Sequence, residues 1–224
     1  MQQTWFTSDL HLSHKLCTNT RGFSSPEEMN KKIYEMFDVV HKGDYVYILG
    51  DVGWDPNDVK VFLDFLIMKK KVAKIVIIEG NHDRNWIGKF ILHPRVEIHQ
   101  TMTLHSQPKN GYNAIFLSHY PQIIYDKSHY GAYQLHGHGH KDTSDRPMLD
   151  ALQMGKRLNV NCELNDYKLW SRDDIEKVMA TKPNNIDHYL CRGTDRQKKK
   201  VVKMLKKING ILEGLNKLGD IPQA

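Results

Sequence analysis

The chain has 224 residues, of which 40% are hydrophobic and 26% charged, so it can bury the core of one substantial globular domain. No apolar run approaches the length of a membrane span, and the N-terminus lacks a basic-then-apolar signal, so we expect a cytoplasmic protein with no membrane partner. Cys17, Cys162 and Cys191 are far apart, which excludes a zinc ribbon and indicates reduced thiols.

The formal net charge of +6 comes from the C-terminal tail. From Arg192 onward the chain has nine Lys or Arg and three Asp or Glu, whereas the rest has 23 of each and is neutral. We therefore predict a catalytic domain over residues 1–190 and a basic helical extension over residues 191–224.

Strands and amphipathic helices alternate in the first third of the chain. Thr4–Ser8 is typical of a buried strand. A helix is predicted from Ser25, with serine as cap and Pro26 at the first position. A strand at Tyr45–Leu49 and a helix starting at Asp55 follow. The run from Lys74 to Glu79 is nearly all apolar, which favours a sheet covered on both faces.

Strands follow one another more closely in the second half. Met102–Leu104 and Asn113–Leu117 predict a hairpin whose turn is Pro108–Gly111. Two further strands are expected at Tyr133–Leu135 and Arg157–Asn161, before a helix capped by Ser171. This order indicates an α/β layered fold in which sheets pack together with helices outside.

The tail from Thr194 to Leu218 predicts one more helix. Apolar residues recur at alternating spacings of four and three, namely Val201, Leu205, Ile208, Leu212 and Leu215. The favoured interpretation is a helix that packs on the body with a solvated basic face. A contact with nucleic acid and self-association through the apolar seam stay open as alternatives. Gly210 and Gly214 weaken any long rigid helix.

Polar residues follow five of the predicted strands. The groups are Asp9 with His11, Gly50-Asp51, Gly80-Asn81-His82-Asp83, Ser118-His119 and Gly137-His138-Gly139-His140. Because open α/β sheets bind ligands beyond the ends of their strands, we expect these side chains to form one site.

The collected donors suit metal ions. The candidate ligands are Asp9, His11, Asp51, Asn81, His119, His138 and His140. Imidazole and carboxylate donors without a thiolate favour Mn, Fe or Zn over Ca or Mg. Seven ligands are too many for one ion, but a bridging Asp51 would let two ions share them. We predict two divalent ions, with manganese expected and iron or zinc as alternatives.

Such a pair of ions predicts hydrolysis of an anionic phosphate ester. A metal-bound hydroxide would attack phosphorus, and His82 would protonate the leaving group as general acid. The expected substrate is a phosphodiester or a phosphomonoester, with a slight preference for diesters. A nucleotide or nucleic acid is one candidate class of substrate. His14, Arg21 and Arg84 are candidate substrate contacts.

The order D-x-H, G-D, G-N-H-D, H, G-H-x-H resembles the calcineurin-like metallophosphoesterase superfamily, over residues 4 to 180. The opening Thr7-Ser8-Asp9 with His11 and His14 is most similar to the small prokaryotic and phage-type phosphoesterases. The resemblance implies a sandwich of two β-sheets flanked by helices. It also implies one metal held by Asp9, His11, Asp51 and His140 and another held by Asp51, Asn81, His119 and His138.

The chain departs from the protein phosphatases of that superfamily, which show GDxVDRG and GNHE. Here the corresponding residues are Gly50–Trp54 and Gly80–Asp83, so phosphoprotein substrates are not expected. The alternative function is a catalytically weak protein that binds nucleic acid through its basic tail. That alternative would need salt-sensitive binding without turnover.

Overall fold

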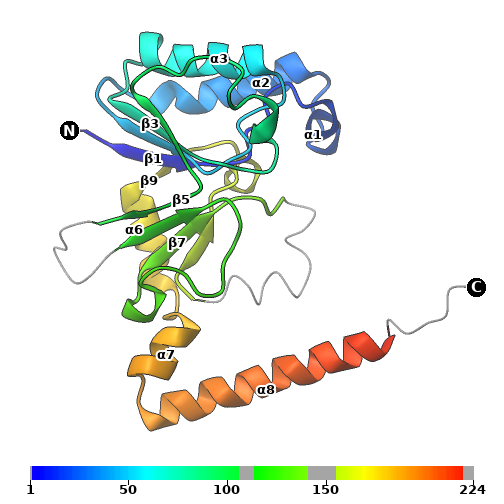
Figure 1. Cartoon of the computed structure of the whole chain (residues 1–224), viewed down its shortest axis with the longest axis vertical. Helices are drawn as coiled ribbons and strands as arrows, with labels where there is room; N and C mark the ends of the chain where they lie inside the picture. The colour runs from blue at the N-terminus through cyan, green and yellow to red at the C-terminus, as the bar shows by residue number, and fades with distance from the viewer. Residues whose placement is uncertain (1, 106–113, 141–154, 219–224) are drawn as a thin grey trace, which may run out of the picture.

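The computed structural model describes residues 2–105, 114–140 and 155–218, apart from the side chains of 207–218. Its strands form two mixed sheets (Figure 1). The five-stranded sheet has the order β4 (Val96–His99), β3 (Lys74–Ile78), β2 (Tyr45–Ile48), β1 (Thr4–Thr7) and β9 (Trp170–Ser171). The four-stranded sheet has the order β5 (Thr101–Leu104), β6 (Ile115–Ser118), β7 (Tyr133–His136) and β8 (Arg157–Asn159).

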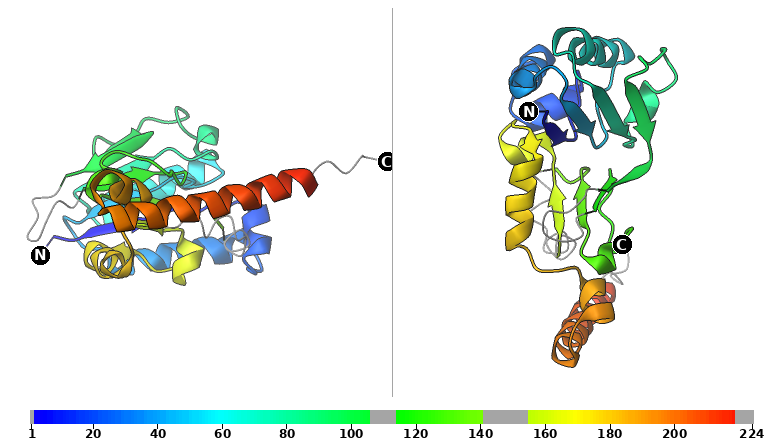
Figure 2. Two further views of the ribbon diagram at one scale, coloured as in Figure 1. Left: turned by 90° about the horizontal axis from the view of Figure 1, so that it is seen from below. Right: turned by 90° about the vertical axis from the view of Figure 1, so that its left-hand side faces the viewer.

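Helices cover the outside of these sheets. The α-helices are α1 (Lys15–Thr20), α2 (Pro26–Met36), α3 (Pro56–Asp64), α6 (Arg172–Thr181), α7 (Ile186–Arg192) and α8 (Asp195–Leu218). Short helical turns are η1 (Phe37–Val39), η2 (Phe65–Lys69), η3 (Asp83–Asn85), η4 (Ser128–Tyr130) and η5 (Cys162–Asn165). Figure 2 shows α2 and α3 over one sheet and the second sheet on its other side, so the expected two-sheet α/β fold flanked by helices is confirmed.

Two apolar layers hold this arrangement. One lies between the five-stranded sheet and helices α2 and α3, where Ile33 and Phe62 pack against Val46 and Ile75. The other lies between the two sheets, where Phe6 and Leu135 belong to one buried cluster. The nearly continuous apolar strand β3 is buried on both faces, as its sequence predicts.

The predicted helix starts are confirmed by their caps. The Ser25 hydroxyl accepts a hydrogen bond from the Glu28 backbone N–H, and the Asp55 carboxylate accepts from Asn57 and Asp58. Strands β5 and β6 pair antiparallel, so the hairpin pairing is confirmed. Its predicted turn, Pro108–Gly111, lies outside the described residues.

Strands β1 and β2 run parallel, and their loops stay paired beyond the strand ends. The Asp9 N–H donates to the Gly50 carbonyl at 2.9 Å, and the His11 N–H donates to the Asp51 carbonyl at 2.9 Å. These two bonds align the first two polar groups of the sequence on one edge of the sheet.

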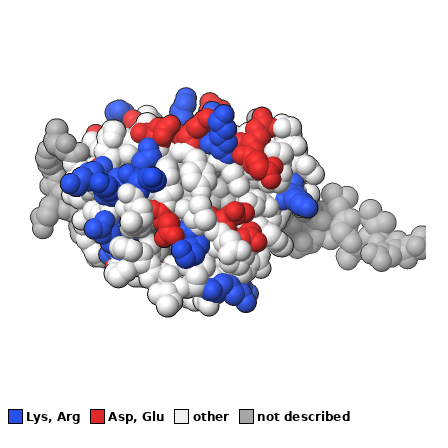
Figure 3. Space-filling view, turned by 90° about the horizontal axis from the view of Figure 1, so that it is seen from above, with Lys and Arg blue, Asp and Glu red and all other residues white. Residues whose placement is uncertain are grey.

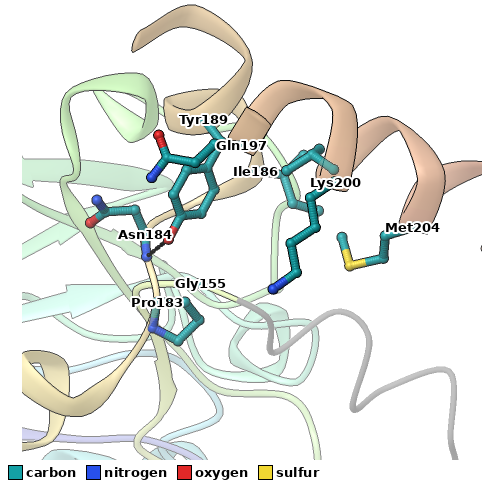
Figure 4. Close-up of a pocket in the computed structure, with 9 residues that line it drawn as sticks. Gly155, Pro183, Asn184, Ile186, Tyr189, Gln197, Lys200 and Met204 are labelled. Carbon is teal, nitrogen blue, oxygen red and sulfur yellow. Dashed lines mark hydrogen bonds between the residues drawn. The ribbon is translucent and has the colours of Figure 1, made fainter. Parts of the chain in front are cut away.

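Helix α8 lies at the opposite end from α2 and α3, where it crosses below the sheets and extends past them on one side (Figure 1). Its first turns pack on α7, and a pocket of about 330 Å³ between the two helices is lined by Ile186, Tyr189, Val201 and Met204 (Figure 4). The expected helix is thus confirmed through both glycines, while the domain boundary at residue 190 stays a prediction. Within the part of the chain that is described, no helix is long and apolar enough to cross a membrane.

Candidate metal centre

The five strand-end groups converge on the carboxylate of Asp51. Its Oδ2 lies 3.6 Å from His11 Nε2 and 3.5 Å from His119 Nε2. Because one oxygen lies at nearly equal distance from two imidazoles, Asp51 joins two groups of donors.

The first donor group contains Asp9, His11 and His140. His11 Nε2 and His140 Nε2 are 3.3 Å apart, and they lie 4.0 Å and 3.9 Å from Asp9 Oδ1. The second group surrounds Asn81, whose Oδ1 lies 3.1 Å from His119 Nε2 and 3.2 Å from His138 Nδ1. All seven predicted ligands are therefore brought together, around the side chains of Asp51 and Asn81.

The buried charge of the centre fits a bound cation. Asp9 and Asp51 are buried, and within the described ranges their ion-pair partners are histidines rather than Lys or Arg. Burial raises the pKa of Asp9 to about 6 and lowers the pKa of His11 well below its usual value. Neutral imidazoles and uncompensated carboxylates are the forms that bind divalent metal ions.

Hydrogen bonds from behind orient two of the imidazoles. His119 Nδ1 donates a hydrogen bond to the Leu49 carbonyl at 2.8 Å. The lone pair of Nε2, on the side of Asp51, is then available to a metal ion. His140 Nδ1 lies 3.1 Å from Glu163 Oε1. Burial alone would lower the pKa of His140, but the hydrogen bond with Glu163 and the charge of Asp9 outweigh it and raise that pKa.

Arg21 is not positioned to contact substrate, contrary to our expectation. Its Nε donates to Glu163 Oε2 at 2.8 Å, and its terminal nitrogens donate to the carbonyls of Asp9 and Leu10 at 2.7 and 3.1 Å. The side chain is only 3% exposed. Its guanidinium therefore holds the Asp9 loop and Glu163 by hydrogen bonds and is not accessible to a phosphate.

Asp83 ties together the loops that carry Asp51 and Asn81. Its carboxylate accepts hydrogen bonds from the backbone N–H groups of Asp51, Val52 and Gly80 at 2.8–2.9 Å, and from Trp86 Nε1 at 2.8 Å. The carboxylate of Asp83 therefore holds the backbone of the site.

The backbone at the site has little freedom. Asp9, His11, Asp51 and His138 all have φ between 53° and 66°, a left-handed conformation that costs free energy for residues with a side chain. A Cβ on Gly80 would collide with the Asp51 carboxylate, so only glycine permits this approach. Several ligands are thus held in strained positions by the surrounding loops.

His82 and His14 line the side of the first donor group. The ring of His82 is 5.2 Å from that of His11, and its backbone N–H donates to Asp51 Oδ1 at 2.9 Å. The ring of His14 is 5.4 Å from both and also caps α1 by accepting from the Cys17 N–H. Burial lowers the pKa of His14. Both rings lie where a substrate held by the centre would meet them.

Arg84 remains a candidate substrate contact. Its side chain is 82% exposed, and its Nε lies 3.9 Å from Glu79 Oε1. It lines a polar groove that also includes Asn81 and His119.

The sequence did not reveal Glu163, Trp54 or Tyr120 as part of the site. Glu163 comes two residues after the predicted strand Arg157–Asn161, and it meets His140 and Arg21 only through the fold. Trp54 lies 4.6 Å from His14 and Tyr120 lies 4.6 Å from His138, measured between ring centroids. Trp54 comes three residues after Asp51 and Tyr120 directly follows His119, and this closeness in the sequence is a signal that could have found them.

Comparison with known proteins decides the family. A family model described as calcineurin-like phosphoesterase matches residues 3–211. The chain belongs to the calcineurin-like phosphoesterase family. It is therefore a hydrolase of phosphoester bonds, and its Asp and His clusters include groups that could hold a divalent metal ion of the kind this family binds.

Relatives of this phosphoesterase occur in phages. It is 26% identical over 200 residues to the gene 66 protein of Mycobacterium phage L5, across 78% of this chain and 93% of that protein. The gene 66 protein of Mycobacterium phage D29 is 36% identical over 87 residues, which cover 38% of this chain and 42% of that protein. A solved structure, the protein of unknown function AQ665 from Aquifex aeolicus, has a TM-score of 0.58 at 24% identity, covering 80% of this chain and all of AQ665. The likeness to AQ665 supports the fold.

Proposed function

We propose that this enzyme is a phosphodiesterase with two divalent metal ions, of which manganese is the expected native ion. Asp9, His11, Asp51 and His140 would hold one ion, and Asp51, Asn81, His119 and His138 the other. The observation that carries the proposal is Asp51 Oδ2, which lies 3.6 Å and 3.5 Å from an imidazole of each set. When bound, such ions supply a nucleophile from water near neutral pH and stabilise the negative charge that develops on phosphorus.

The residues around the centre would orient the ester and move one proton. Asp51 Oδ1 accepts the His82 N–H, so the His82 ring is positioned by the same residue that joins the two donor groups. We propose that His82 donates a proton to the oxygen that leaves phosphorus. His14, 5.4 Å from His82 between ring centroids, would contact a non-bridging phosphoryl oxygen or keep His82 in place.

The small number of available arginines near the centre favours a diester substrate over a monoester. A monoester carries one more negative charge than a diester at neutral pH, and arginine is the usual side chain that binds it. Arg21 is committed to Glu163 and backbone carbonyls, which leaves Arg84 as the arginine of the described groove lining.

We propose that the enzyme acts in the cytoplasm, since Cys17, Cys162 and Cys191 are free thiols.

Hydrolysis of two chromogenic esters tests the proposal. Metal-stripped protein re-supplied with Mn²⁺ should cleave bis-p-nitrophenyl phosphate faster than p-nitrophenyl phosphate. Asp51→Asn should abolish both activities, whereas Asp64→Asn, which removes an exposed partner of Lys60, should not. A faster monoester reaction would overturn the diester assignment. Turnover that needs no metal, or that survives in Asp51→Asn, would overturn the mechanism.

A further inference from the structure

A polar groove opens directly from the second donor group. Its volume is about 230 Å³, and Asn81 and His119 form part of its wall. Guanidinium and amide side chains continue the wall, from Arg84, Gln100 and Gln122. The groove therefore extends the metal centre with groups that can form hydrogen bonds to a ligand larger than a phosphate.

Tyr120 supplies an aromatic ring at this groove. The ring is 4.6 Å from His138 and 5.0 Å from His119 between centroids, and 48% of the residue is exposed. Its backbone carbonyl accepts the Ser118 hydroxyl at 2.8 Å. An aromatic ring that is half open to solvent offers a surface on which a flat ligand can stack.

A second exposed ring lies at the first donor group. Trp54 is 46% exposed, and its ring is 4.6 Å from His14 and 5.7 Å from His82 between centroids. Its backbone N–H donates to the Leu12 carbonyl at 2.9 Å, which fixes the loop after Asp51. Each donor group thus has one open aromatic ring beside it.

Stacking rings next to hydrogen-bonding side chains are the means by which proteins hold unpaired nucleobases. Every base can stack on an aromatic ring, amide side chains can bind base edges, and arginine binds the neighbouring phosphate. A diester with one base on each side would use a ring at each donor group. Bases inside a duplex are stacked on one another and could reach neither ring.

We propose that the scissile diester belongs to a single-stranded nucleic acid, with one flanking base on Tyr120 in the groove and the other on Trp54. This inference rests on the proposed phosphodiesterase function and names its substrate class. Arg84 would bind a phosphate next to the scissile one.

Binding measured apart from turnover tests this substrate class. The probe is a fluorescein-labelled phosphorothioate oligothymidine of about 12 nucleotides, which resists cleavage, and the readout is fluorescence anisotropy on Mn²⁺-loaded full-length protein. Tyr120→Ala should raise Kd about tenfold, and Tyr120→Phe should restore it, since phenylalanine keeps the stacking face. Tyr130→Ala, which removes an equally exposed tyrosine beside Arg192, should leave Kd unchanged.

The salt dependence of the same binding tests the phosphate contact. Arg84→Gln should reduce the slope of log Kd against log salt concentration by about one. A Kd that is unchanged in Tyr120→Ala, an equal loss in Tyr130→Ala, or binding of a duplex as tight as the single strand would overturn the proposal.

Turnover of a small ester distinguishes a wrong substrate class from a wrong phosphodiesterase function. Methyl p-nitrophenyl phosphate reports the phosphodiesterase reaction without a second aromatic group. If it is hydrolysed but the oligonucleotide is not bound, the substrate class is wrong and the function stands. If it is not hydrolysed with Mn²⁺ present, the proposed function itself fails.

Discussion

At the scale of single residues, the centre depends on groups that fix the ligands as much as on the ligands themselves. Glu163 links His140 to Arg21, and Asp83 links the Asp51 loop to Gly80. Such partners set ring orientation and backbone position before any ion binds. Mutations behind the site should therefore weaken metal binding without touching a ligand.

Glu163→Gln tests this supporting role. The substitution keeps the shape of the side chain but removes the charge that faces His140 Nδ1 and Arg21. We expect the Mn²⁺ affinity to fall about 10–100-fold, measured by calorimetric titration. Glu176→Gln, which removes an exposed partner of Arg172, is the matched control and should bind Mn²⁺ normally. Normal affinity in Glu163→Gln would show that His140 needs no such partner.

The role of His82 is tested by the leaving group. In His82→Asn, hydrolysis of diesters with a poorly acidic alcohol should slow by about 10²–10⁴-fold, because the oxygen that leaves needs a proton. The loss should be much smaller for p-nitrophenol, which leaves as a stable anion. Measured rates that fall equally for both leaving groups would argue against general acid catalysis by His82.

At the scale of elements, the loop that begins β2 is held by a single carboxylate. Asp44 accepts hydrogen bonds from the backbone N–H groups of Gln3 and His41 and from Trp5 Nε1, at 2.8–2.9 Å. Burial would raise the pKa of Asp44, but these three donors outweigh it and hold the pKa below the usual 3.8. The ionised form of Asp44 is therefore favoured by folding.

Asp44→Asn should destabilise the fold in a pH-dependent way. A depressed folded-state pKa contributes stability above the unfolded value of 3.8 and loses it as the pH falls through the folded value. We expect a loss of about 1–3 kcal/mol at pH 7 in urea unfolding, shrinking below about pH 4. Asp38→Asn, at an exposed partner of Lys70, is the control. A loss that stays constant across this pH range would contradict the prediction.

Local sequence signals were sufficient to predict the strands and helices next to the candidate metal ligands. Strand ends followed by Asp51 or His119, and helix starts capped by Ser25 or Asp55, each lie within a few residues of their own signal. Helix α1 was missed because its cap is His14 and not one of the usual capping residues. Strand β4 was missed because it has only four residues at the edge of its sheet, although Val96 and Ile98 alternate with Glu97 and His99 as in a half-buried strand.

The supporting residues could not be predicted for a different reason. Arg21 and Glu163 are 142 positions apart and meet only when η5 packs behind β1. An arginine after the first ligand pair was interpreted as a phosphate contact because the sequence does not show which way its side chain turns. The ligands could be found from local pattern, but their partners required the tertiary structure.

At the scale of the whole molecule, charge is spread unevenly. Figure 3 shows acidic and basic side chains mixed on the face over α2 and α3, as suits the solvated side of two helices. The net positive charge lies on α8, which packs on α7 at the other end of the molecule. A contact of α8 with nucleic acid, and the alternative function as a binding protein, stay predictions.

Charge changes on α8 should not affect the reaction itself. Lys199→Gln with Lys203→Gln should leave turnover of methyl p-nitrophenyl phosphate within about twofold, because both residues are exposed and none of the described α8 side chains is a donor of the centre. The same variant should bind the oligonucleotide more weakly only if α8 also contacts nucleic acid. A large loss of small-ester turnover would show that α8 supports the centre.

The central claim is that one carboxylate joins two metal sites, and metal stoichiometry tests it most directly. Mn²⁺ bound per chain should be measured by calorimetric titration of metal-stripped wild-type protein, Asp51→Asn and the control Asp64→Asn. We expect two ions for wild type and the control, and a loss of both high-affinity sites in Asp51→Asn. A single ion in the wild-type protein, or two retained in Asp51→Asn, would contradict it.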